Sequence, residues 1–179
     1  MLQGLGVPSV NGGILWPDEV NRLFYLYGGE YNNGSVLDFQ IFWFYDAINK
    51  SWNRSLGSDT LSNVSTNGDG KLVALSWPAF GAGAVTDSGV GYYYGGYLSN
   101  KSVVDWSGDP FMLNSLVSFN MTTQSWTNRT YDSTPRAEGS MQFIPASESG
   151  MLVYFGRLEM SSKGEVEYVN TPTTVLSVC

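Results

Sequence analysis

Apolar and polar residues alternate in short runs along the chain, and residues that favour turns separate these runs. The first clear run, Leu23 to Tyr27, ends at a pair of glycines, Gly28 and Gly29. Short alternating runs bounded by Gly, Pro, Asn and Asp are typical of β-strands joined by tight turns. No segment sustains the 3.6-residue period of a helix. The pattern therefore predicts an almost wholly β chain.

The same pattern recurs further along. A second run ends at Gly95 and Gly96, and a third, over residues 151–155, ends at Gly156. A strand-like piece precedes each run across a polar turn, which predicts a β-hairpin. In the first two units an aromatic residue also stands seven positions before a tryptophan. These pairs are Tyr45 with Trp52 and Phe119 with Trp126.

These units resemble the kelch repeat, which forms four-stranded blades of a β-propeller. The segment from Pro135 to Met141, followed by residues 150–156, is also similar to the secreted or membrane-anchored kelch-repeat proteins of fungi. The resemblance implies about two and a half four-stranded antiparallel blades, hence an incomplete propeller. It also implies that the glycine pairs and paired aromatics are structural. The glycines permit positive φ and close approach, and the aromatics fill the wedge between blades.

The third unit departs from the pattern. Arg157 follows Gly156 where a second glycine is expected, and no tryptophan follows Trp126. A ring needs about four blades, so we expect either part of a longer propeller or an open stack that self-associates through unpaired blade faces. The predicted organisation is an N-terminal segment (1–10), a blade (11–57), a linker (58–76), a second blade (77–130), a partial blade (131–157) and an aberrant tail (158–179).

Missing residue types exclude several kinds of chemistry. The chain has no His, and its single Cys is Cys179, so Ser-His-Asp and Cys-His catalysis and His-ligated metals are excluded. The kelch propeller is also similar to that of galactose oxidase, whose copper-radical chemistry requires His ligands and a Tyr linked to an internal Cys. We therefore expect a non-catalytic chain without cofactor or metal. The alternative is a fragment of a kelch-containing enzyme whose catalytic residues lie elsewhere.

Three pairs of carboxylates and one loop are candidates for glycosidase or calcium chemistry. The pairs Asp18 with Glu19, Asp105 with Asp109, and Glu165 with Glu167 form no recognisable glycosidase constellation. The loop Asn67-Gly68-Asp69-Gly70 lacks the other carboxylates of an EF-hand. Turn chemistry explains Asp18 with Glu19 and the loop over residues 67–70. Asp105 and Asp109 lie in a long loop, and Glu165 and Glu167 lie in the aberrant tail.

Net charge and loop length limit the classes of binding partner that we expect. The net charge is −7, with 9 basic and 16 acidic residues, which argues against nucleic acid. The loop from Tyr97 to Pro110 is longer than a blade needs, and long loops on rigid scaffolds often bind. We interpret it as a site for a protein or a carbohydrate. Its candidate residues are Tyr97, Asp105, Trp106 and Asp109.

Glycosylation sequons point to a compartment. Seven Asn-x-Ser/Thr sequons favour the secretory pathway, although the chain shows no signal peptide and no apolar run that could cross a membrane. We therefore expect an extracellular or cell-surface protein, which is either secreted or membrane-anchored. This chain would then be a fragment of it, or the product of a gene model that starts too late. An intracellular kelch adaptor is the disfavoured alternative. The sequons begin at Asn33, Asn49, Asn53, Asn63, Asn100, Asn120 and Asn128.

Overall fold

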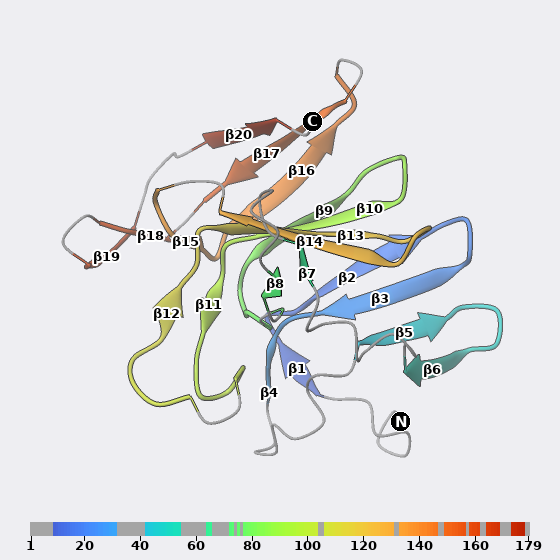
Figure 1. The fold of residues 1–179 in the computed structure, drawn as a ribbon, viewed down its shortest axis with the longest axis horizontal. Helices are drawn as coiled ribbons and strands as arrows, with labels where there is room; N and C mark the ends of the chain where they lie inside the picture. Colours follow the sequence, from blue (N-terminus) through green and yellow to red (C-terminus); the bar gives the residue numbers. More distant parts are fainter. Residues whose placement is uncertain are drawn as a thin grey trace.

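Every regular element in the described part of the computed structural model is a β-strand, as the sequence predicts. The strands form three twisted blades stacked side by side, with further short strands at one end (Figure 1). The structure describes residues 9–31, 42–54, 64–65, 72–73, 75, 77–103, 106–130, 133–146, 149–156, 158–161, 164–168 and 173–177.

The first blade is a four-stranded antiparallel sheet in the order β2-β3-β5-β6. Acidic residues close its turns. The Asp18 carboxylate accepts hydrogen bonds from the Asn21 backbone N–H at 3.0 Å and from its side-chain amide at 2.8 Å. Asp46 accepts similar bonds from Asn49. The strands are β2 (Ile14–Asp18), β3 (Leu23–Tyr27), β5 (Trp43–Asp46) and β6 (Ser51–Arg54).

The second blade contains the expected four strands and two more. The additional strands, β7 (Val64–Ser65) and β8 (Leu72–Val73), lie within the predicted linker and extend the outer edge, where β7 runs parallel to β14. The sheet order is β8-β7-β14-β13-β10-β9. The other strands are β9 (Ala82–Val85), β10 (Val90–Tyr94), β13 (Ser115–Asn120) and β14 (Ser125–Thr130).

The third blade has three described strands, β16 (Ser140–Ile144), β17 (Met151–Phe155) and β20 (Thr173–Ser177). Strand β20 comes from the tail that the sequence analysis set apart, yet it pairs with β17 from Met151↔Ser177 to Phe155↔Thr173. The tail therefore contributes a strand to this blade. A hairpin inserted between β17 and β20 stretches the spacing, and no tryptophan marks the returning strand, so the repeat pattern was lost.

Blades one and two pack through an aromatic core. Trp16 of blade one stands over Gly91 of blade two, where an added Cβ would lie 2.6 Å from the indole ring. The Trp16 Nε1–H donates to the Tyr92 carbonyl at 3.2 Å. Phe119 and Trp126, with ring centroids 4.5 Å apart, are buried against the same face of blade one. Both rings therefore fill space between blades one and two.

The corresponding pair in blade one differs from the expectation. Tyr45 and Trp52 contact each other at 5.4 Å but are only half-buried. The strand register places them on the same face as the exposed side chains of Leu15 and Phe24, which is turned away from blade two. They do not fill a wedge here, because no described segment packs a further blade on that face.

Blades two and three pack through a smaller cluster. Tyr94 and Leu116 of blade two meet Met141, Leu152 and Tyr154 of blade three. The Tyr94 and Tyr154 rings touch edge to face at 5.1 Å. Blade two is thus covered on both faces, and this explains why it is the best buried of the three.

Hydrogen bonds at the glycine pairs connect successive blades. The Gly29 N–H donates to the Pro78 carbonyl at 3.0 Å, and the Gly96 N–H donates to the Arg136 carbonyl at 2.8 Å. An added Cβ on Gly28 would lie 2.4 Å from the Pro78 oxygen, and one on Gly95 would lie 2.2 Å from the Arg136 oxygen. Both pairs also have positive φ. Only glycine meets these two requirements at once.

A second series of hydrogen bonds joins the residues two positions before the first strand of each blade. The Phe80 N–H donates to the Gly12 carbonyl at 2.8 Å, and the Glu138 N–H donates to the Phe80 carbonyl at 2.7 Å. All three residues have positive φ, between 55° and 71°. The three blades are therefore joined head to tail by one repeated backbone contact.

Candidate ligand-binding site

The chain leaves each blade after its second strand and forms short strands at one end of the molecule (Figure 1). Blade one contributes β4 (Glu30–Tyr31), which pairs with β1 (Val10–Asn11). Blade two contributes the hairpin of β11 (Tyr97–Leu98) and β12 (Phe111–Met112). Blade three contributes β18 (Leu158–Met160) and β19 (Val166–Tyr168), which form a sheet with β15 (Arg136–Ala137).

A pocket of about 460 Å³ lies between these three connections. One wall is apolar and the other is polar, and each of the three blades contributes at least one residue. The apolar wall consists of Pro110, Met112, Leu158, Met160 and Val166. The polar wall consists of Glu30, Tyr97, Ser99, Asn100 and Lys101.

The apolar wall is held in place by a small core. The pairing Met160↔Val166 puts both side chains on the face of the hairpin that carries Leu158. Leu158 packs with Met112 and Ala137. Cross-strand neighbours share a face of a sheet, so Leu158, Met160 and Val166 lie together on one face of the hairpin, next to Tyr168.

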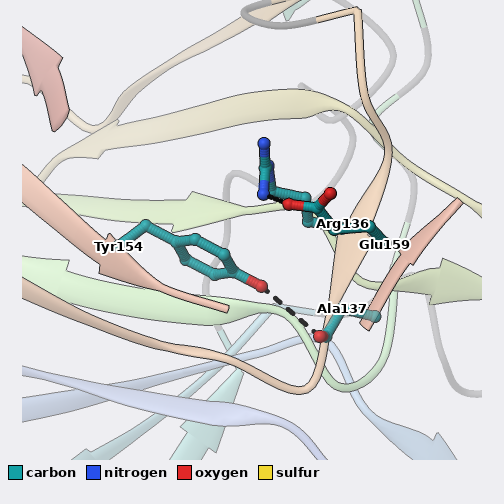
Figure 2. Close-up of polar contacts among 4 residues, drawn as sticks. All are labelled: Arg136, Ala137, Tyr154 and Glu159. Carbon is teal, nitrogen blue, oxygen red and sulfur yellow. Dashed lines mark hydrogen bonds and ion pairs between the residues drawn. The ribbon is translucent and has the colours of Figure 1, made fainter. Parts of the chain in front are cut away.

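Polar contacts fix β15 behind the apolar wall. Arg136 on β15 forms an ion pair with Glu159 on β18, and the Tyr154 hydroxyl donates to the Ala137 carbonyl at 3.3 Å (Figure 2). The wall therefore rests on blade three through β15, and its position is set by the blade.

The polar wall joins blades one and two. The Ser99 hydroxyl donates to Glu30 Oε1 at 2.7 Å and accepts from the Lys101 N–H at 3.1 Å. The Ser102 hydroxyl, which is buried, accepts from the Ser99 N–H at 2.8 Å. The Tyr31 N–H donates to the Lys101 carbonyl at 3.0 Å. These bonds orient the Glu30 carboxylate at the pocket.

Tyr97 completes this wall. Its ring stacks on Phe80 with centroids 5.3 Å apart. Burial, with a further contribution from the negative charges of Glu30 and Glu138, raises the pKa of Tyr97 to about 12. The hydroxyl therefore stays protonated at neutral pH and can donate to a ligand.

The structure separates the residues predicted for binding. Tyr97 lines the pocket, whereas Trp106 and Asp109 are not among its lining residues. The Trp106 Nε1–H donates to the Asp109 carbonyl at 3.2 Å, so the indole is tied to its own loop. Asp105 lies outside the described residues.

Most of the pocket residues were not singled out from the sequence. One signal was available, because Glu30 and Tyr97 each directly follow a glycine pair and Leu158 stands at the matching place in the third unit. The methionines and Val166 carry no such mark, and their convergence depends on how the three connections fold together.

The sequons stay a prediction, but five of their asparagines lie in described segments. Asn100 is exposed at the pocket, and Asn49 is exposed in a turn. Asn53, Asn120 and Asn128 are partly buried in strands. Asn33 and Asn63 lie outside the described residues.

The carboxylates weighed for catalysis occupy ordinary positions. Asp18 caps its turn. Glu165 directly precedes β19, Glu167 lies within it, and both are exposed. Among the residues that the structure describes, no three acidic, His or Cys side chains gather as a metal site, and no helix is long and apolar enough to cross a membrane.

Comparison with known proteins decides the repeat type. No protein-family model matches the chain. A Kelch repeat-containing protein of Arthroderma benhamiae is 34% identical over 106 residues, which make up 57% of this chain and 15% of that protein. The kelch resemblance is confirmed. The described blades are consistent with an incomplete kelch propeller, and the chain spans about 15% of the length of this relative.

Proposed function

We propose that this kelch-type interaction module is a non-catalytic part of a secreted or cell-surface glycoprotein, and that it binds a protein or a carbohydrate at the glycine-pair end. The observation that carries the proposal is the pocket between the three blade connections. It joins an apolar wall to a fixed carboxylate and a neutral phenol, which is the usual make-up of a binding site. Rigid blades hold its walls, and loops on rigid scaffolds commonly carry function.

Binding can be tested on mixed arrays of synthetic peptides and glycans. The 179-residue chain is compared with Met112→Glu, which places a charge in the apolar wall, and with Val20→Glu, an equally charged change in an exposed turn away from the pocket. We expect array signals that Met112→Glu loses and Val20→Glu keeps, provided that circular dichroism shows both variants folded. If no array member binds, or if both variants bind alike, the proposed site is wrong.

The extracellular part of the proposal has its own test. Expression through a secretory pathway should yield a chain whose gel mobility increases after endoglycosidase treatment. Asn49→Gln should remove one glycan, because Asn49 is exposed in a described turn away from the pocket. Secreted protein with unchanged mobility would contradict the glycoprotein assignment and leave the pocket proposal standing.

A further inference from the structure

The pocket that carries the proposed function also indicates which class of ligand it takes. The apolar wall carries the thioether side chains of Met112 and Met160 and the aliphatic side chain of Val166. Such a wall suits a flexible apolar side chain, because methionine adapts its shape to what it contacts. A sugar ring, in contrast, is usually held on an open aromatic face. The Tyr97 ring is stacked on Phe80, and Trp106 does not line the pocket.

The Glu30 carboxylate gives the pocket a place for a cation. Glu30 and Lys101 are the charged residues among those that line it. One Glu30 oxygen accepts from Ser99, and the second carboxylate oxygen has no partner among the described residues. An Arg or Lys of a ligand can donate to that oxygen.

The edge of β19 offers a way to hold a peptide backbone. Strand β19 is the last strand in the order β15-β18-β19, and its residues are exposed. An extended peptide added there would place the residue opposite Val166 on the Val166 face, where the pocket lies.

We propose that the pocket binds an extended peptide segment that carries an aliphatic side chain next to Lys or Arg. The aliphatic side chain packs on the apolar wall beside Val166, and the cation pairs with Glu30. This inference rests on the proposed function, since it names the ligand class of the same site.

Three synthetic ten-residue peptides test the inference by fluorescence anisotropy with the full chain. The first has a central Leu flanked by Lys, the second replaces Lys by Glu, and the third replaces Leu by Ala. We expect binding of the first alone, weakened by added salt, because partly exposed charges are screened. Glu30→Gln should weaken it roughly three- to fivefold, whereas the matched control Glu19→Gln in a distant turn should not change it.

Val166→Lys adds a second check, because it brings like charge to the pocket at an exposed position. It should abolish binding of the lysine peptide while circular dichroism stays unchanged. Equal binding of the Lys and Glu peptides, or no effect of Glu30→Gln, would overturn the inference. Glycan binding without peptide binding would overturn it and leave the proposed function intact, whereas no binding to either array class would remove both.

Discussion

Gly28, directly after the second strand of blade one, is subject to two separate constraints. Comparing substitutions at Gly28 and at Gly89 can separate the two effects. Gly28 (φ 71°) and Gly89 (φ 76°) share the left-handed conformation. A Cβ on Gly28 would lie 2.4 Å from the Pro78 oxygen, whereas one on Gly89 would contact nothing within 4 Å. Only the first glycine therefore combines conformational strain with a clash against the next blade.

We predict that Gly89→Ala lowers the free energy of unfolding by about 1–2 kcal/mol, the usual cost of a left-handed alanine. Gly28→Ala should cost about 1–3 kcal/mol more, because the backbone of blade two must move. Urea denaturation of both variants measures the difference. Equal losses would mean that the carbonyl contact between blades does not constrain Gly28.

Tyr154 makes stability depend on alkaline pH. Burial raises its pKa to about 12, so the folded chain keeps the proton that the unfolded chain loses above pH 10. Below pH 10 the titration of Tyr154 therefore does not change the free energy of unfolding. Between pH 10 and 12 it lowers that free energy by about 1.4 kcal/mol per pH unit.

The variant Tyr154→Phe removes this titration and also the bond to the Ala137 carbonyl. We expect it to be less stable than the parent at pH 8 and to lose less stability between pH 10 and 11. The measurement is urea denaturation at these pH values. An unchanged slope would show that Tyr154 ionises normally in the fold.

Strands and connections differ in how far the sequence predicts them. The blade strands follow from alternation and from marks such as Gly28 and Trp126, because each mark answers a local need of the backbone or the core. Strand β20 has no mark, and it is recognised only by its pairing with β17. The pocket depends on contacts between residues distant in sequence, such as Glu30 with Ser99, so Tyr97 was found and Val166 was not.

Replacing the tryptophan by alanine should destabilise the chain more in the pair Phe119 and Trp126 than in the pair Tyr45 and Trp52. Trp126 is buried between blades one and two, whereas Trp52 is half-buried on the outer face of blade one. We expect Trp126→Ala to cost about 3–5 kcal/mol, as for a large core side chain, and Trp52→Ala roughly 1–2 kcal/mol from lost apolar burial. Chemical denaturation checks both. A larger loss for Trp52 would show that its face is covered in solution.

The stack of blades is open at both ends in the described structure. Leu15 and Phe24 are exposed on blade one by 49% and 38%, and Ile144 and Phe155 on blade three by 39% and 52%. On β10 of the central blade, the Tyr93 and Tyr94 side chains have 1% and 0% exposure. Both ends thus resemble the faces that pack between blades.

We predict that the isolated chain self-associates at micromolar concentration through these faces, because exposed apolar surface of this kind drives association. The double variant Ile144→Ser with Phe155→Ser should shift the equilibrium toward monomer. Val20→Ser should not, because Val20 is 90% exposed in a turn and lies on no blade face. Sedimentation velocity over a concentration series distinguishes these outcomes. A parent chain that stays monomeric throughout, or a control that dissociates as far as the double variant, would show that the blade faces do not associate.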